Sequence, residues 1–296
     1  MQERIPGINA AAQLHLGQIG IWSGAIKNAP AEKAVEAARE LERLGFPTLW
    51  IPGGLDSEVL ARLDELLRGT SRIKLATGII NIWKHEPAEL GLWWKRQPRE
   101  HQSRLLLGLG VSHGPLIGEA YHQPLARMRE FLDGLDAAQV PRDRLCIAAL
   151  GPKMLELAAQ RTAGAHPYLV STGHTAFART LMGPGPLLAP EQGVILERDP
   201  HGARHIARET VRFYLRLPNY YNNWRRSGFS DEEIAQLSDR FIDSVVAWGD
   251  LEAIAARVNA HLAAGADHVC LQVLSGGMGR DVGLEEPSWR ELARLL

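Results

Sequence analysis

Residues 28–51 read NAPAEKAVEAARELERLGFPTLWI, and this stretch contains one complete structural unit. Asn28 can cap a helix, and Pro30 suits a first helical turn. Alanines and leucines then recur at helical spacing as far as Leu44, and Gly45 stops the helix. The apolar run over 48–51 is typical of a buried strand. The stretch therefore predicts a helix that leads directly into a strand.

The same unit recurs along the chain. A helix predicted from Pro152 to Gly164 leads into a strand over 166–170, and another from Asp250 to Gly265 leads into a strand over 268–273. Further apolar runs at 17–22, 73–77, 104–110, 145–150 and 193–197 raise the number of expected strands to eight. Alternating helices and strands indicate parallel strands joined by crossover helices. Eight of them favour a (β/α)8 TIM barrel, an α/β fold, over an open doubly wound sheet.

The composition suits one large barrel domain over residues 1–296 that binds a small molecule. Hydrophobic residues make up 45% of the 296 residues, enough for a large core. Lys and Arg number 33 and Asp and Glu 34, and the net charge of -1 excludes a general attraction to nucleic acid or to an anionic membrane surface. No stretch approaches the roughly 20 apolar residues that span a bilayer, and residues 1–15 do not resemble a signal peptide.

The two cysteines indicate the compartment. Cys146 and Cys270 lie in apolar runs that read as two different strands. We expect buried thiols of a reducing cytoplasm rather than a disulfide or a metal pair.

Two stretches depart from the repeated unit. Residues 79–101 are rich in tryptophan and basic side chains, and residues 218–229 combine aromatic and polar side chains. In a barrel such insertions form loops over the carboxyl-terminal rim, where binding residues collect. A dimer contact, or a helix packed on the outside of the barrel, explains each stretch equally well.

The turn after the fifth predicted strand suits an anion. Gly151 and Pro152 open the next helix, whose free backbone N–H groups can bind a phosphate, and Lys153 adds a positive charge. An ordinary strand-to-helix turn is the alternative. His113, just past the fourth strand, is a candidate proton donor or cofactor contact, or else a hydrogen-bonded loop histidine.

Other catalytic patterns are weak. Gly108 and Gly110 lack the third glycine of a dinucleotide fingerprint, because His113 stands at that position. His201 and His205 lie four residues apart without a third ligand, so we predict a solvated helix face and no metal. This scarcity of acid–base side chains suits a cofactor that itself carries the chemistry.

Four segments occur in order along the chain: TGIINIW at 77–83, LGLGVSH at 107–113, AALGPKM at 148–154 and GAHPYL at 164–169. Over about 17–273 the chain resembles the luciferase-like monooxygenase superfamily, especially its F420-dependent oxidoreductase branch. The resemblance implies a luciferase-like TIM barrel with insertions at the carboxyl-terminal rim. It also implies a homodimer that binds coenzyme F420, a deazaflavin, and transfers a hydride to or from a small organic substrate.

The resemblance also implies cofactor contacts. In such proteins the third strand commonly ends in a non-prolyl cis peptide bond behind the cofactor ring, and here that bond would join Gly78 and Ile79. Pro167 and Tyr168 would line the same groove. The phosphate would lie at the turn formed here by Gly151, Pro152, Lys153 and Met154.

Two departures from the family pattern affect the expected chemistry. Relatives that oxidise sugar phosphates carry an Asp-His pair after the second strand, where this chain has Gly53 and Gly54, so we do not expect that activity. A glutamate after their fourth strand is replaced by His113, which becomes the candidate for protonating a reduced product. The segment 91–99 stands where the family has a long Ala-rich helix, and whether it is helical stays open.

Several alternatives remain. An FMN-dependent monooxygenase would keep the fold but would not need to bind the acidic tail of the deazaflavin. A Schiff-base aldolase would use Lys74 or Lys153. A non-catalytic cofactor-binding member would explain Gly53 and Gly54. The candidates for binding the acidic tail are Lys84, Lys95 and Lys153.

Overall fold

Parallel strands form the barrel, and from β1 to β8, apart from β4, they follow one another around the sheet in chain order. The structure is a computed structural model that describes residues 14–54, 57–276 and 284–296. Strands β1, β2, β3, β5, β6 and β7 pair in succession, and β11 pairs with the other side of β1. The strands are β1 (Ile19–Trp22), β2 (Thr48–Ile51), β3 (Lys74–Thr77), β4 (Ile80–Asn81), β5 (Leu105–Gly110), β6 (Leu145–Ile147), β7 (Gly164–Ala165), β8 (Leu187–Leu188), β9 (Glu191–Ile195), β10 (Val246–Trp248) and β11 (Val269–Val273).

The extended segment that contains β8 and β9 closes the sheet. β8 pairs with β7, and β9 pairs with β11. Between them, the Glu191 N–H donates to the Pro167 carbonyl at 2.8 Å, and the Cys270 N–H donates to the Pro190 carbonyl at 3.0 Å. The two ends of the sheet therefore meet on one segment, and the predicted (β/α)8 barrel is confirmed. Two further short strands complete the sheet: β4 pairs with β5, and β10 pairs with β9.

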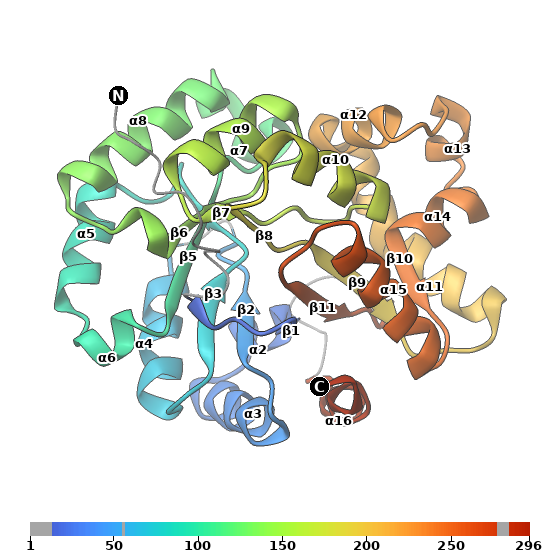
Figure 1. Ribbon diagram of the computed structural model, residues 1–296, viewed down its shortest axis with the longest axis horizontal. Coiled ribbons are helices and arrows are strands. Elements are labelled where there is room, and N and C mark those ends of the chain that lie inside the picture. Colours follow the sequence, from blue (N-terminus) through green and yellow to red (C-terminus); the bar gives the residue numbers. More distant parts are fainter. Residues whose placement is uncertain (1–13, 55–56, 277–283) are drawn as a thin grey trace.

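The helices surround the barrel (Figure 1). In Figure 1, α3, α4, α5 and α8 cover the half formed by the early strands, and α11, α14 and α15 cover the half formed by β9, β10 and β11. The helices are α2 (Gly24–Asn28), α3 (Ala31–Leu44), α4 (Val59–Gly69), α5 (Pro87–Arg96), α6 (Arg99–Gln102), α7 (Gly114–Ile117), α8 (Pro124–Ala137), α9 (Pro152–Arg161), α10 (Thr172–Met182), α11 (Pro200–Arg212), α12 (Pro218–Arg226), α13 (Asp231–Ala235), α14 (Asp239–Val245), α15 (Leu251–Ala263) and α16 (Glu286–Leu292). A 3-10 turn, η3 (Phe213–Arg216), leads into α12.

The first helix–strand unit forms largely as its sequence predicts. α3 ends at Gly45, whose φ of 96° is in the left-handed region that favours glycine. β2 follows, buried along its whole length. The start of the helix was predicted wrongly, because Asn28 ends the short helix α2 and Pro30 is the cap residue of α3.

The sixth and seventh predicted strands have different bounds in the structure. β7 lies at 164–165 rather than 166–170, and Gly164 belongs to the strand instead of stopping the preceding helix. A Cβ on Gly164 would lie 1.9 Å from the Leu187 carbonyl oxygen, so only glycine allows β8 to approach this closely. β9 begins at Glu191, two residues before the predicted start at Gly193.

The two predicted rim loops are largely helical. The segment 87–96 forms α5, and the prolines at 87 and 98 mark its first turn and the start of α6. The segment 218–226 forms α12, which buries Tyr220 and Trp224 on one face. A helical pattern of aromatic residues was therefore mistaken for an irregular loop.

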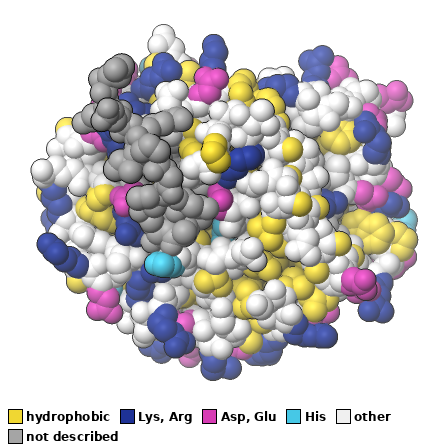
Figure 2. All heavy atoms as spheres, viewed as in Figure 1, with side chains coloured by type: hydrophobic (Ala, Val, Ile, Leu, Met, Phe, Trp, Pro, Cys, Tyr) yellow, Lys and Arg dark blue, Asp and Glu magenta, His cyan; other side chains and the backbone are white. Residues whose placement is uncertain are grey.

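The barrel interior contains both cysteines. Cys146 of β6 and Cys270 of β11 are buried and free, as predicted, and burial raises the pKa of both thiols. Among the described residues, no helix is long and apolar enough to cross a membrane. Figure 2 shows basic and acidic side chains interspersed over the visible face of the molecule.

Candidate active site

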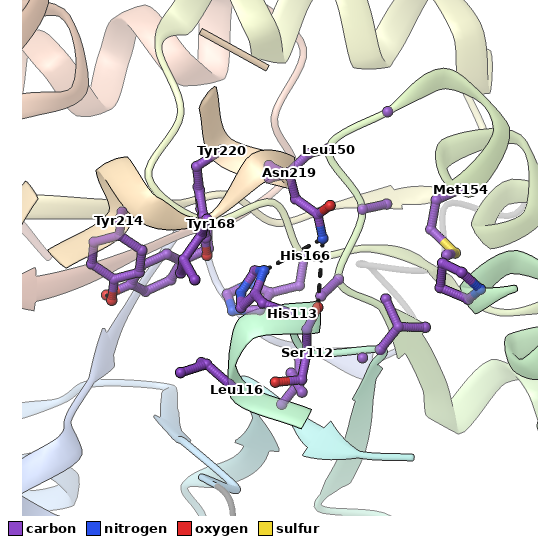
Figure 3. Close-up of a pocket in the computed structure, with 18 of the residues that line it drawn as sticks. Ser112, His113, Leu116, Leu150, Met154, His166, Tyr168, Tyr214, Asn219 and Tyr220 are labelled. Atoms are coloured by element: carbon purple, nitrogen blue, oxygen red, sulfur yellow. Dashed lines mark hydrogen bonds between the residues drawn. The ribbon is translucent and has the colours of Figure 1, made fainter. Parts of the chain in front are cut away.

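The carboxyl ends of the strands surround a cavity of about 610 Å³. Its walls include Trp22 at the end of β1, Gly78 after β3, Gly110 at the end of β5 and His166 after β7. The 3-10 turn η3 and helix α12 cover one side of it, and Figure 3 shows the residues that point into it. The cavity therefore lies where active sites of barrels are found.

A backbone bulge forms part of the cavity wall. The peptide bond between Gly78 and Ile79 is cis, as the resemblance implies. The Gly78 N–H donates to the Ile51 carbonyl at 2.9 Å, and the Gly53 N–H donates to the Ile79 carbonyl at 3.0 Å. A Cβ on Gly110 would lie 2.6 Å from the Ile79 side chain. Glycines on the neighbouring strands thus make room for the bulge.

Two ring nitrogens meet the bulge without hydrogen-bond partners. A Cβ on Gly78 would lie 2.5 Å from Trp22 Nε1 and 2.7 Å from His166 Nε2. Both nitrogens are buried and unpaired among the described residues. His166 Nδ1 lies 2.7 Å from the Ala189 carbonyl, an acceptor, so Nδ1 carries the proton and Nε2 is a bare acceptor. Burial lowers the pKa of His166 to about 4, which keeps its ring neutral.

One end of the cavity is positively charged. Gly151 is the N-cap residue of α9, and the first turn of this helix opens on the cavity. Lys153 and Arg226 also line it, and the Arg226 Nη2 lies 3.8 Å from the position that a Cβ on Gly151 would occupy. None of the described lining residues is acidic. A helix N-terminus with two cations suits a phosphate or carboxylate.

The opposite end is aromatic. Figure 3 shows Tyr168, Tyr214 and Tyr220 far from Met154, which marks the charged end. The Tyr214 hydroxyl donates to the Tyr168 hydroxyl at 3.1 Å, and the Tyr168 hydroxyl donates to Gln272 Oε1 at 2.8 Å. Burial raises the pKa of all three phenols, that of Tyr214 to about 12. This end therefore presents neutral aromatic rings.

His113 lies between the two ends, just past β5. Asn219 of α12 contacts it, with Nδ2 at 3.4 Å from His113 Nδ1. Burial lowers the pKa of His113 to about 4, so the ring is uncharged at neutral pH. His113 can therefore act as a hydrogen-bond donor or acceptor, but it does not store a proton as an imidazolium.

Most of the predicted site residues share this cavity. Pro167 does not line it; this residue is buried, and its carbonyl accepts a hydrogen bond from the Glu191 N–H. Lys84 and Lys95 do not line it either. The lining residues that were predicted are Gly78, Ile79, His113, Gly151, Pro152, Lys153, Met154 and Tyr168.

Several lining residues were missed. Trp22 is the last residue of one predicted strand and His166 the first residue of another, but neither belongs to a sequence motif that predicts a role for its ring nitrogen. The stretch 218–229 was predicted to lie over the rim, and its mixture of polar and aromatic residues could have indicated that these side chains line the cavity. The missed lining residues with polar side-chain atoms are Trp22, Ser112, Tyr121, His166, Tyr214, Asn219, Tyr220, Asn222 and Arg226.

Of the two lysines considered for a Schiff base, Lys153 lines the cavity and Lys74 does not. Lys74, a candidate for a Schiff base, begins β3 at the amino-terminal end of the barrel, where its Nζ donates to the Ser103 carbonyl at 3.2 Å. His201 and His205 lie on α11. Within residues 14–54, 57–276 and 284–296, no group of three His, Cys, Asp or Glu side chains is placed to hold a metal ion.

Comparisons with known proteins give a family match and a relative for this chain. Residues 12–268 match the protein family described as Luciferase-like monooxygenase. A Mycobacterium tuberculosis protein named as a candidate coenzyme F420-dependent oxidoreductase is 29% identical over 128 residues, which are 41% of this chain. The match spans 35% of that relative, about a third of its length.

Solved structures share the fold at low sequence identity. An F420-dependent secondary alcohol dehydrogenase with an F420-acetone adduct has a TM-score of 0.68 at 14% identity, over 94% of this chain and 98% of that one. The F420-dependent tetrahydromethanopterin reductase of Methanopyrus kandleri has a TM-score of 0.71 at 16% identity, over 93% and 96%. The FMN complex of a Pseudomonas putida 3,6-diketocamphane monooxygenase component has a TM-score of 0.67 at 11% identity, over 93% and 95%.

These structural likenesses establish the fold, and the family match covers most of the sequence. The chain belongs to the luciferase-like monooxygenase family.

Proposed function

We propose that this protein is an oxidoreductase that binds coenzyme F420 in the cavity and transfers a hydride between this deazaflavin and a small organic substrate. The observation that carries the proposal is the division of the cavity into a cationic end, a backbone bulge and an aromatic end. When bound, the deazaflavin would supply or accept the hydride. The protein itself would position both molecules and exclude water.

The cationic end fits the charged part of the cofactor. Gly151, Pro152, Lys153 and Met154 would hold its phosphate at the start of α9, with Arg226 above them. The ring would lie along the bulge at Gly78 and Ile79, and Tyr168 would line the groove beyond it. The unpaired nitrogens of Trp22 and His166 are buried polar atoms that mark this wall as polar.

FMN is the second candidate cofactor, because it has a similar tricyclic ring and a phosphate, and a solved neighbour of the same fold contains it. The side chains beyond the phosphate favour the deazaflavin. Lys153 and Arg226 are two cations in a cavity whose described lining has no acidic residue, which suits a ligand with more negative charge than one phosphate.

Replacement of the cation above α9 tests the proposal. We expect Arg226→Gln to weaken F420 binding about 10-fold or more, because a charge-assisted hydrogen bond contributes about 1.5 to 3 kcal/mol. Arg225→Gln is the matched control, because Arg225 lies next to it on α12 but its Nε pairs with Asp231 at 3.0 Å on the surface. Fluorescence titration would measure both. Equal affinities for the two variants would argue against an anion site here.

We also propose that the protein acts as a homodimer in the cytoplasm. Two free, buried cysteines suit a reducing compartment. Sedimentation equilibrium would test the dimer, which has twice the 32.6 kDa mass of the chain. A single species at 32.6 kDa, measured at micromolar concentration, would contradict it.

A further inference from the structure

We propose that the aromatic end of the cavity binds a planar, uncharged, conjugated carbonyl compound, whose oxygen is held by His113 and Tyr220 while its β carbon accepts a hydride. This inference rests on the proposed function, because reduced deazaflavin would supply the hydride. It assigns catalytic roles to two side chains, one of which the sequence did not single out.

The contacts of Asn219 fix the proton on His113. Asn219 Nδ2 lies 3.5 Å from the Ser112 carbonyl, which can only accept a hydrogen bond, so this atom is the amide nitrogen. The same nitrogen lies 3.4 Å from His113 Nδ1 (Figure 3). In the arrangement we propose, Nδ1 accepts from this nitrogen, and the proton of the neutral ring resides on Nε2. His113 therefore offers an N–H donor from the ring edge opposite Asn219.

Tyr220 supplies a second neutral donor. The hydroxyls of Tyr214 and Tyr168 are committed to a chain that ends on Gln272. Tyr220 also lines the cavity, but within the described part of the chain its hydroxyl is not tied into this chain of hydrogen bonds, and only burial and the nearby Tyr214 and Glu191 affect its pKa. Its ring centroid lies 5.2 Å from that of His113. In Figure 3 the Tyr220 side chain extends from α12 toward the part of the cavity where His113 lies.

The surroundings define the substrate. Trp22, Tyr168 and Tyr214 form aromatic walls with centroid distances of 5.7 Å between successive rings, which suits a flat apolar molecule. The lining cations Lys153 and Arg226 lie at the other end. Burial lowers the pKa of His113 and raises that of Tyr220, so both groups stay neutral donors through the physiological pH range.

Two neutral donors on one oxygen stabilise negative charge that develops there. The β carbon of the substrate would accept a hydride with its electron pair from reduced deazaflavin, which is thereby oxidised. The C=C pair then shifts toward the carbonyl carbon, and the carbonyl π pair moves onto the oxygen to give an enolate. After the hydride transfer is complete, solvent water protonates the enolate at the α carbon, and the remaining hydroxide takes up the proton that the deazaflavin releases on oxidation. The saturated carbonyl compound then leaves.

A phenolate tests the donor pair without turnover. 4-Nitrophenol is planar, and its ionised oxygen resembles that of an enolate. Titration of the protein loaded with oxidised deazaflavin, followed by absorbance at several pH values, reports which ionisation state is bound. We expect preferential binding of the anion, so that the bound phenol ionises at lower pH than the free one.

Tyr220→Phe removes only the hydroxyl and should weaken binding of the anion about 10- to 100-fold, as expected for a hydrogen bond to a charged group. The matched control is Tyr221→Phe, the same change at the next position of α12, because Tyr221 does not line the cavity. Thermal unfolding checks that both variants fold.

The outcomes separate the two proposals. Equal affinity of Tyr220→Phe and Tyr221→Phe for the anion, or equal binding of neutral and ionised 4-nitrophenol by the unmodified protein, would overturn the donor pair. If deazaflavin does not bind but the anion preference persists in the cofactor-free protein, the proposed cofactor fails and the donor pair stands.

Discussion

Gly78 illustrates how a single residue determines the shape of the site. A Cβ there would come within 2.5 Å of Trp22 Nε1 and 2.7 Å of His166 Nε2, both of which are buried. We expect Gly78→Ala to destabilise the protein by about 1 to 3 kcal/mol, as overpacking does, and to abolish cofactor binding. Denaturant unfolding and a deazaflavin titration would measure this. Gly185→Ala is the control, because a Cβ there meets nothing within 4 Å; equal effects at both glycines would refute the account.

Glu191 predicts a pH dependence of stability. Its buried carboxylate accepts a hydrogen bond from the Leu169 N–H at 2.9 Å, and burial raises its pKa to about 8 from an ordinary value of 4.5. The folded protein therefore retains a proton that the unfolded chain loses above pH 4.5. The contribution of this proton to the free energy of unfolding is complete below pH 4.5 and is lost as pH rises through about 8. The loss is at most about 1.4 kcal/mol per pH unit.

Glu191→Gln should remove this contribution. The difference in free energy of unfolding between the variant and the unmodified protein should change steadily between pH 5 and 8, measured by urea denaturation at each pH. Glu36→Gln, an exposed change, should give a constant difference. A constant difference for Glu191→Gln as well would show that the carboxyl is already ionised at neutral pH.

At the scale of elements, α12 connects the two ends of the cavity. It carries Asn219 and Tyr220 near His113, and Arg226 near α9. Trp224 on the same helix is fully buried, with its ring 4.8 Å from Phe241 and its Nε1 donating to the Leu169 carbonyl at 3.3 Å. This one anchor therefore holds the binding face of the helix.

Trp224→Ala should destabilise the protein by about 3 to 5 kcal/mol, because it leaves a large cavity. It should also weaken binding at both ends of the cavity, since Arg226 and Tyr220 share the helix. Guanidinium denaturation and the titrations above would measure both effects. Arg225→Ala, which removes only an exposed ion pair, should cost at most about 1 kcal/mol. A Trp224 variant with unchanged binding would show that α12 is held by other contacts.

The elements also show what the sequence could and could not predict. The units around Gly45 and Gly265 were predicted because helix periodicity and a terminal glycine are local signals. β7 was misplaced because it is only two residues long and because its glycine is required by the close approach of β8, not by the end of a helix. α12 was missed although Tyr220 and Trp224 have the four-residue spacing of one helix face.

The cavity lining was predicted at Gly78 from a motif of the resemblance, and at Gly151 from the helix start as well as from the resemblance. It was not predicted where distant segments meet. Arg226 approaches Gly151, and Asn219 approaches His113, only because the barrel brings α12 over β5 and β6. A periodicity or motif within a single segment cannot predict a contact between distant segments.

At the scale of the whole molecule, the charge of the cavity differs from that of the chain. The protein has a net charge of -1, yet the described lining includes Lys153 and Arg226 and no acidic residue. The proposed binding of an anionic cofactor therefore rests on this local arrangement rather than on overall charge.

The most direct test is a parallel titration of the purified protein with coenzyme F420 and with FMN, followed by tryptophan fluorescence, which Trp22 in the cavity wall should report. The account predicts binding of F420 in the low micromolar range, on the order of 8 kcal/mol, and clearly weaker binding of FMN. Tighter binding of FMN would contradict the choice of cofactor, and binding of neither would contradict the proposed function.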